Sequence, residues 1–261
     1  MKKKLTLSLC ALLLFLVCSN SVSAITWIPK EFTCPIDNEK NTFLVVGSYG
    51  SYIYNYPSKY QWLFFPDTSG NNFYMCKKCH LTTYMWDFDR FPKQKIEAVK
   101  KVLATIEQEK FTKYNKVAVT KRLEVMEKVY GELDKDEIWW ERFNRIKGFH
   151  YGKAGEADKA RAARLKSLET IKSELNKGNS KTPKKILYYV SGALKHFLND
   201  DAGARADFDK ALQTRYAKDG AKSGELKNAE ANLNQRLNDY IKVMYEEKNP
   251  RSADRDPGHS H

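Results

Sequence analysis

Two cysteines separated by two residues, Cys76 and Cys79, constrain this chain more than any other feature of its sequence. A pair with this spacing can offer two sulfurs to one metal ion, which then needs further ligands from another part of the chain. Cys34 and Asp37 have the same spacing and lie far earlier in the sequence. The two pairs together predict a site in which two loops close on one metal ion and cross-link a segment rich in loops.

The expected metal is zinc in a structural role, because three cysteine thiolates are ligands that zinc favours. Two residues compete for the fourth position. Asp37 completes the spacing of a second close pair, whereas His80 is the softer ligand but directly follows Cys79, and adjacent residues chelate one ion awkwardly. Water in an open fourth position is the remaining alternative. The sequence therefore predicts zinc bound by Cys34, Cys76 and Cys79, with Asp37 favoured over His80 as the fourth ligand.

Three other roles for these cysteines compete with zinc. Residues 76–80 match the Cys-x-x-Cys-His pattern of c-type haem attachment, but haem leaves Cys34 without a role. A redox pair would stand at a helix N-terminus after a strand in a βαβ unit, and no such unit is predicted downstream. A disulfide between Cys34 and either Cys76 or Cys79 stays open, because exported proteins fold in oxidising compartments.

The N-terminal residues indicate export. Three lysines precede an apolar run, and small residues follow up to Ala24, so residues 1–24 are predicted to be a signal peptide cleaved after Ala24. The apolar run is shorter than the roughly twenty residues that a membrane span needs. Lipidation of Cys18 is disfavoured because a branched residue, Val17, precedes it. We therefore expect a periplasmic or secreted protein with no stable membrane span after cleavage.

Cleavage would leave an odd number of cysteines and a basic chain. It removes Cys10, Cys18 and three lysines but no acidic residue, so the formal net charge falls from +13 to +10. A basic balance often indicates nucleic-acid binding, but export argues against that partner. The net positive charge then favours acidic proteins, anionic envelope polymers or lipid headgroups as partners.

Residues 25–92, which we call the head, are predicted to form a small, irregular β structure with a zinc-ribbon-like arrangement. Residues 43–46, 52–54 and 61–65 are β-prone runs separated by glycine and proline. Aromatic rings crowd this segment, where they either fill its core or stand exposed to bind sugars or a protein. These rings belong to Tyr49, Tyr52, Tyr54, Tyr56, Tyr60, Trp62, Phe64, Phe65, Tyr84 and Trp86.

Short motifs in residues 33–92 resemble a known bacterial family. They are Thr33-Cys34-Pro35, the stretch from Asn72 to Cys79, and Asp87-Phe88. This pattern is similar to the family called domain of unknown function 2225, and the resemblance implies a paired-knuckle metal site ahead of tetratricopeptide-like helices, with no established activity. The chain departs from the family at Asp37, where cysteine is expected, and at His80, where glycine is expected. These departures put the metal affinity in question rather than the geometry of the two loops.

Residues 93–248 are predicted to form an antiparallel, tetratricopeptide-like (TPR-like) helical solenoid. After Pro92 the spacing of apolar residues changes to 3.6, with helices expected at 96–106, 119–133 and 223–246 and an N-cap within 134–136. Between them, small and aromatic residues recur in one register. The first set is Gly148, Tyr151, Gly155 and Ala160, and the second is Tyr188, Gly192, Ala204, Phe208 and Ala211. Residues 249–261 are predicted to be a disordered tail, so the expected fold class is α+β and mainly α.

The sequence favours a binding function over a catalytic one. A helical solenoid offers a groove for a protein partner. We therefore expect an exported, non-enzymatic interaction or assembly protein of the bacterial envelope, such as a component of a periplasmic filament or secretion apparatus. The alternative is a metal-dependent or redox enzyme, with Asp87 or Asp89 as the nearest general base.

Overall fold

The computed structural model describes residues 25–49, 58–177, 180–216 and 223–246. The predicted signal peptide, the β-prone run at 52–54 and the predicted tail lie outside these residues. The described chain is mainly helical, with two antiparallel two-stranded sheets. The strands are β1 (Ile25–Thr33), β2 (Lys40–Tyr49), β3 (Phe73–Met75) and β4 (Thr82–Tyr84). The helices are α2 (Ile96–Leu103), α3 (Val119–Gly131), α4 (Glu137–Lys153), α5 (Ala157–Asn176), α6 (Lys184–Phe197), α7 (Asp201–Gln213) and α8 (Ser223–Glu246).

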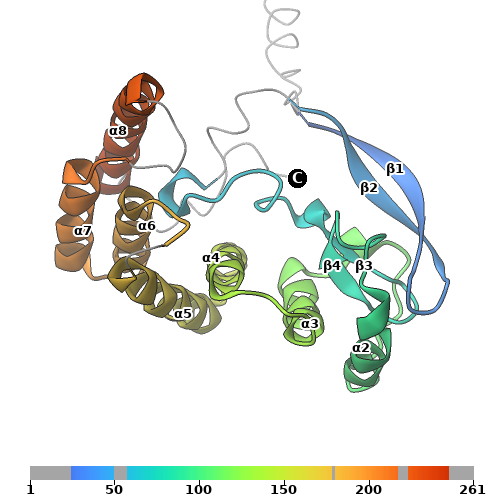
Figure 1. Cartoon of the computed structure of the whole chain (residues 1–261). Coiled ribbons are helices and arrows are strands. Elements are labelled where there is room, and N and C mark those ends of the chain that lie inside the picture. Colours follow the sequence, from blue (N-terminus) through green and yellow to red (C-terminus); the bar gives the residue numbers. More distant parts are fainter. Residues whose placement is uncertain (1–24, 50–57, 178–179, 217–222, 247–261) are drawn as a thin grey trace, which may run out of the picture.

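The elements form an arc with the β1–β2 ribbon at one end and α8 at the other (Figure 1). Within the arc, α4 packs on α5 and α6 packs on α7. In the part of the chain that the structure describes, no helix is both long and apolar enough to cross a bilayer.

The helices begin and end close to where the apolar spacing predicts. The expected N-cap before α4 is confirmed, because the Asp136 carboxylate accepts a hydrogen bond of 2.8 Å from the backbone N–H of Trp139. The predicted last helix coincides with α8, whose exposed side chains are mostly polar. Periodicity was therefore a sufficient signal for α2, α3 and α8.

The two central helix pairs make their closest contacts at corresponding glycines. A Cβ atom on Gly148 of α4 would lie 2.9 Å from the Arg164 side chain on α5. A Cβ atom on Gly192 of α6 would lie 2.6 Å from the Phe208 ring and 3.0 Å from the carbonyl oxygen of Ala204, both on α7. Only glycine permits these approaches. The register of small residues read from the sequence therefore marks real helix contacts in both pairs.

One hydrophobic core joins the head to the first helices. It continues across residue 92, where the sequence predicts the end of the head, so α2 and α3 cover the β elements directly. Its buried members include Cys34, Phe43, Tyr74, Cys76, Phe88, Val99, Leu103, Val125 and Val129. The ring of Phe43 stacks on Tyr74 with centroids 4.2 Å apart, which fastens the ribbon to β3.

A buried arginine fixes α3 to the β3–β4 sheet. The Arg122 side chain is 1% exposed, and its guanidinium donates to the backbone carbonyls of Gly70, Phe73 and Val117 at 2.7, 2.7 and 3.1 Å. Burial lowers the pKa of Arg122 to about 10, which leaves the group charged at neutral pH. This cation satisfies three backbone acceptors that the core would otherwise bury unpaired.

The prediction of a strand at residues 61–65 is wrong. The chain instead forms a short 3-10 turn at Lys59–Gln61, and Trp62 adopts a left-handed φ of 55° that no regular strand permits. Residues 58–69, which we call the inner segment, cross the inner side of the arc (Figure 1). The apolar pattern did not predict this conformation, because the partners of these rings come from distant helices and from the ribbon.

Side chains of helix α4 bind the inner segment mainly through the backbone of that segment. Arg145 donates to the carbonyl oxygens of Gln61 and Trp62, each at 3.2 Å. The Nε2 atom of His150 lies 3.0 Å from the carbonyl oxygen of Asp67, and the guanidinium of Arg142 pairs with the Asp67 carboxylate. Most of these contacts reach main-chain carbonyls, so they depend on the backbone conformation of the segment more than on its side chains.

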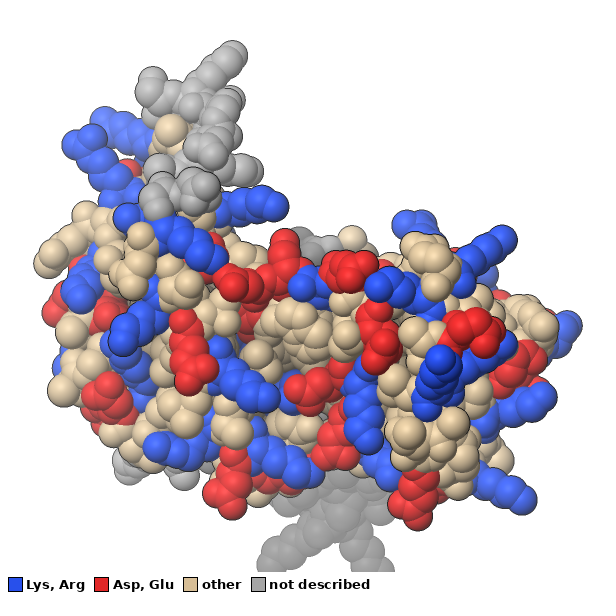
Figure 2. All heavy atoms as spheres, turned by 60° about the horizontal axis from the view of Figure 1, so that its bottom comes forward, with Lys and Arg blue, Asp and Glu red and all other residues tan. Residues whose placement is uncertain are grey.

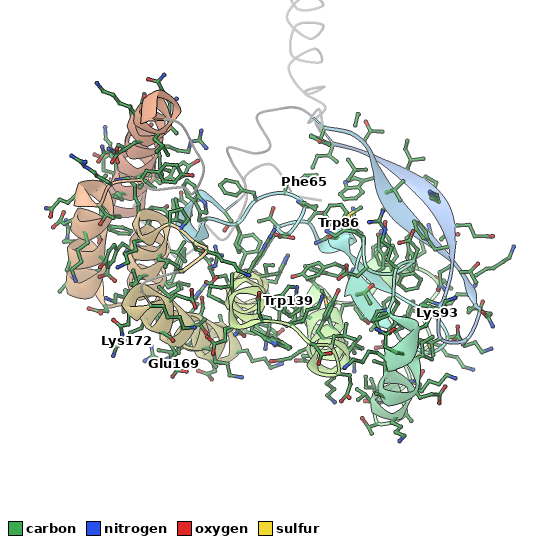
Figure 3. The ribbon with its side chains drawn as sticks, in the orientation of Figure 1. Phe65, Trp86, Lys93, Trp139, Glu169 and Lys172 are labelled. Carbon is green, nitrogen blue, oxygen red and sulfur yellow. The ribbon has the colours of Figure 1, made fainter. Side chains whose placement is uncertain are left out.

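Aromatic side chains complete the contact with the C-terminal half. The Trp62 ring lies 5.4 Å from Tyr189 of α6 and 5.9 Å from Tyr240 of α8. At the other end of the segment, Phe65 lies 6.0 Å from Trp27 of the ribbon and is visible on the inner side of the arc in Figure 3. The inner segment thus ties together elements from the beginning, middle and end of the chain.

The buried histidine at this contact predicts a specific loss of stability in acid. Burial lowers the pKa of His150 to about 4, against about 6.5 in an unfolded chain. The unfolded state therefore binds more protons between these values, so stability present above pH 6.5 is lost as the pH falls toward 4. Between pH 7.5 and 4.5 this one group should cost roughly 2 to 3 kcal/mol.

The measurement compares urea unfolding of the native chain with His150→Gln, whose amide can still donate to Asp67. Carboxylates titrate in both proteins, so only the difference between the two pH dependences reports on His150. Equal slopes for the two proteins would contradict the assignment of a neutral, buried imidazole.

Candidate metal centre

The first loop of the centre joins β1 to β2. The backbone N–H of Cys34 donates to the carbonyl of Glu39 at 2.9 Å, and the N–H of Asn38 donates back to the carbonyl of Cys34 at 3.0 Å. Asn38 has a φ of 59°, a left-handed conformation that asparagine tolerates better than most residues. This turn places Asp37 beside the sulfur of Cys34 on the inner side of the loop.

The second loop joins β3 to β4 and repeats the same backbone pattern. The N–H of Cys76 donates to the carbonyl of Leu81 at 2.9 Å, and the N–H of His80 donates to the carbonyl of Cys76 at 3.1 Å. His80 has a φ of 61° and thus takes the place that Asn38 takes in the first loop. Cys79 accordingly corresponds to Asp37. The two loops are equivalent knuckles, each offering its first and fourth residues as ligands.

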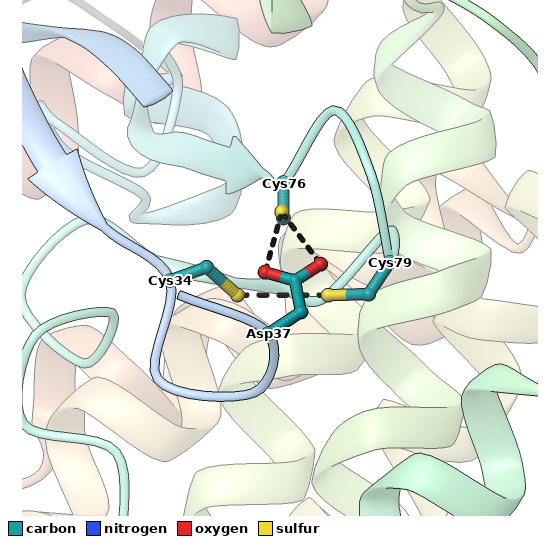
Figure 4. A group of neighbouring side chains, drawn as sticks. All are labelled: Cys34, Asp37, Cys76 and Cys79. Atoms are coloured by element: carbon teal, nitrogen blue, oxygen red, sulfur yellow. Dashed lines mark hydrogen bonds between the residues drawn. The ribbon is translucent and has the colours of Figure 1, made fainter. Parts of the chain in front are cut away.

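The two knuckles bring the predicted ligands together. One donor atom from each of Cys34, Asp37, Cys76 and Cys79 lies within 4.8 Å of the other three. The sulfurs of Cys34 and Cys79 are 3.5 Å apart, and the sulfur of Cys76 is 3.8 Å from each carboxylate oxygen of Asp37 (Figure 4). A tetrahedral zinc ion with bonds of about 2.3 Å to sulfur and 2.0–2.2 Å to oxygen separates its ligand atoms by roughly 3.5–3.8 Å. The separations of these two ligand pairs are therefore those expected in a tetrahedral zinc site.

Cys34, Cys76 and Cys79 are free thiols, so none of the disulfides considered from the sequence is present. Contact among the sulfurs lowers the pKa of Cys76, because Cys34 and Cys79 act as donors to its thiolate. Hydrogen bonding to Cys76 raises the pKa of Cys34, and hydrogen bonding to Cys34 and Cys76 together with burial raises the pKa of Cys79. A bound cation would displace thiol protons, so metal affinity should increase with pH.

His80, the competing candidate for the fourth ligand, lies outside this group. Its Nε2 atom is 3.0 Å from the carbonyl oxygen of Glu109, and its ring stacks on Phe111 with centroids 5.4 Å apart. The side chain is buried in these contacts. Of the two residues proposed from the sequence, the structure groups Asp37 with the thiols, and His80 contributes the turn of the second knuckle.

Comparison with known protein families, with curated proteins and with solved structures finds no match. The chemistry of the centre must therefore be inferred from its own residues.

Sequence reasoning missed Asn41, which links the two knuckles. Its side-chain amide donates to the carbonyl of Glu39 at 2.9 Å and to the sulfur of Cys76 at 3.4 Å. Its side-chain oxygen accepts from the backbone N–H of Lys77 at 2.8 Å. Asparagine is unusual at a buried position at the start of a strand, and this was the feature of the sequence that could have indicated its role. Residues in this position orient metal ligands and commonly affect affinity.

The centre suits a structural metal better than a catalytic one. Cys34 and Cys76 are fully buried and Cys79 is partly exposed. Asp87, the acid suggested from the sequence as a base, accepts a hydrogen bond from the Tyr130 hydroxyl and does not belong to the ligand group. Four protein ligands would close the coordination sphere, and such sites link chain segments rather than activate water.

Proposed function

We propose that this chain is an exported, non-enzymatic assembly or interaction protein of the bacterial envelope, with a structural zinc ion in a zinc-ribbon-like head. The observation that carries the proposal is the pair of equivalent knuckles, which gather three sulfurs and one carboxylate at separations suited to zinc. Sulfur-rich ligand sets favour zinc over harder cations such as Mg²⁺. The motif resemblance to domain of unknown function 2225 is in agreement with this proposal.

Substitutions at Asp37 test the ligand set. Asp37→Ala should weaken zinc binding by at least tenfold or so, because it removes one of four ligands, and Asp37→Cys should strengthen it by supplying a fourth thiolate. Competition with a chromogenic chelator measures both affinities. The matched control is His80→Asn, which removes the imidazole but keeps a residue that tolerates the left-handed turn. A loss of zinc in His80→Asn equal to that in Asp37→Ala would reject Asp37 as the fourth ligand.

The haem and enzyme alternatives receive less support from the geometry. Haem attached to Cys76 and Cys79 would need both sulfurs accessible to its vinyl groups and His80 aimed at the iron. Cys76 is 0% exposed, and His80 points to the carbonyl of Glu109. A zinc hydrolase would need an acid beside the ion that is not itself a ligand, and the one acid grouped with the three sulfurs, Asp37, would serve as a ligand.

For the helical part we propose a TPR-like solenoid that binds a protein partner. The equivalent glycine contacts in α4–α5 and α6–α7 support this proposal, because repeated close packing of helix pairs is what builds a solenoid. The inner segment covers part of the groove side of α4 and α6, so a partner in the groove would meet this segment as well as the helices. Trp86, which is 50% exposed on the head, is a candidate aromatic contact.

The charge distribution bears on the kind of partner. On the face shown in Figure 2, Lys and Arg alternate with Asp and Glu, and the charges do not separate into large regions of one sign. On α5, for example, Glu169 and Lys172 point away from the arc (Figure 3). We therefore expect the net positive charge, which is spread over a broad surface, to accelerate association with an acidic partner.

The functional test uses the intact exported chain as bait in envelope extract at low and high salt. We expect one specific acidic protein, with slower association at high salt because exposed charges are screened beyond roughly 8 Å at physiological ionic strength. Loss of capture after zinc removal would connect the head to binding. Turnover of a small substrate by the zinc-loaded chain, with no partner at either salt concentration, would overturn the proposal in favour of an enzyme.

A further inference from the structure

The three sulfurs of the metal centre are not equivalent. Those of Cys34 and Cys79 are in contact at 3.5 Å, although the two residues belong to different knuckles. The sulfur of Cys76, although it belongs to the same cluster, also contacts the carboxylate of Asp37 and the amide of Asn41 (Figure 4). Of the three possible sulfur pairs, this arrangement favours bond formation between Cys34 and Cys79.

The three cysteine residues also differ in their exposure to solvent. Cys34 and Cys76 are 0% exposed, whereas Cys79 is partly exposed beside Lys77 and Lys78, which are both exposed. Oxidation of cysteines depends on thiolate character and on access. A bound metal ion would hold all three sulfurs as thiolates, so access would decide among them. A reagent arriving from solvent therefore meets Cys79 first, and the sulfur next to Cys79 is that of Cys34.

We propose that the metal centre is also a site of disulfide modification, in which oxidation joins Cys34 to Cys79, releases the metal ion and leaves Cys76 as a thiol. The release step rests on the zinc function proposed above, whereas the choice of sulfur pair rests on the contact and access just described. The two states exclude each other, because the disulfide removes two of the four metal ligands.

The oxidant is a disulfide, either a small molecule or the active-site disulfide of an oxidoreductase. The sulfur of Cys79 attacks one sulfur of the oxidant, the disulfide bond of the oxidant breaks, and its other half leaves as a thiolate. The sulfur of Cys34 then attacks the sulfur of Cys79 and expels the second half. Two electrons pass from the two cysteines to the oxidant, and its two thiolates take up protons, either those lost by the cysteines or protons from water.

The modification would preserve the connection between the loops. Cys34 lies in the β1–β2 loop and Cys79 in the β3–β4 loop, so a covalent bond joins the same two knuckles that a shared metal ion would join. Exported proteins enter oxidising compartments, where metal binding and disulfide formation compete for the same thiols. The head would accordingly be cross-linked in either state, with zinc retained only in the reduced one.

The test uses the zinc-loaded chain beginning at Ile25, treated with glutathione disulfide. Three readouts apply: zinc release to a chromogenic chelator, intact mass, and peptide mapping without reduction. We expect release of the bound zinc, a metal-free mass about 2 Da lower because two thiol hydrogens are lost, and a linked pair of peptides containing Cys34 and Cys79. Cys76 should remain the residue that an alkylating reagent labels. A bond to Cys76, or retention of zinc with no bond formed, overturns the proposal.

Two variants identify the order of attack. Cys34→Ser removes the sulfur that contacts Cys79, so Cys79 should accumulate as a glutathione mixed disulfide with a mass increase of about 305 Da. Rapid formation of a Cys76–Cys79 bond in this variant instead would overturn the special role of Cys34. In Cys76→Ser, which should bind no zinc, the Cys34–Cys79 bond should still form, within a few-fold of its rate in the metal-free native chain. Absence of zinc before oxidation would defeat the proposed zinc function alone, because the peptide map still decides which sulfurs join.

Discussion

Cys34→Ser and Cys76→Ser should each abolish zinc binding and destabilise the chain by roughly 4 kcal/mol when free zinc is about a thousandfold above its dissociation constant. The physical reason is that a ligand bound only by the folded chain adds its binding free energy to folding. The two sulfurs come from opposite knuckles but belong to one ligand group. The double variant should therefore cost no more than either single one, to within about 0.5 kcal/mol.

Urea unfolding with and without zinc, together with metal analysis, measures both effects. The native chain in chelator should show the stability of the variants in zinc, since all of them then lack the ion. Lys78→Ser is the matched control, because Lys78 is exposed in the same loop, and it should change stability by less than about 0.5 kcal/mol. Additive losses for the two cysteines would mean that they act at separate sites.

The ligand group was predictable because its information is local. The spacing of Cys34 with Asp37 and of Cys76 with Cys79 defines two short turns, and each turn orients its ligands through backbone hydrogen bonds within its own loop. The role of His80 was not predictable in the same way. Its identity suggested a ligand, whereas its position requires a left-handed turn, and the neighbours that hold its ring, Glu109 and Phe111, lie outside the motif.

Replacing Arg122 with leucine should destabilise the chain by roughly 3 to 5 kcal/mol. The substitution keeps an apolar stem in the core but leaves the carbonyls of Gly70, Phe73 and Val117 buried without their donor. Chemical denaturation measures the loss. Because Arg122 joins α3 to the residues just before the second knuckle, the variant should also bind zinc more weakly.

Lys128→Leu provides the control for this substitution. Lys128 lies on the same helix but is exposed, so its loss should change stability by about 0.5 kcal/mol or less. Arg122→Lys should give an intermediate loss, since an ammonium keeps the charge but cannot reach three carbonyls in the planar geometry of a guanidinium. A loss in Arg122→Leu no larger than that of the control would show that the three carbonyls find other donors.

The inner segment marks the limit of local sequence patterns. Its rings at Trp62 and Phe65 read as a strand, because aromatic residues are frequent in strands and their burial could be predicted without knowing the partner. The actual partners are α4, α6, α8 and the ribbon, which the chain brings together only in the folded state. Helices with regular spacing were predictable, whereas a segment shaped by long-range contacts was not.

The long-range contacts of Trp62 also affect the order of folding. Trp62 packs against Tyr189 and Tyr240. A residue in the first third of the chain therefore completes its packing only when a helix near the other end has formed. Contacts between distant parts of a chain slow folding because the intervening loop must close first. During synthesis or translocation from the N-terminus, the knuckles can form and take up metal early, whereas the packing of Trp62 is complete only after α8 emerges. A chain stopped before α8 should therefore hold its metal and leave the Trp62 ring more exposed than in the full chain.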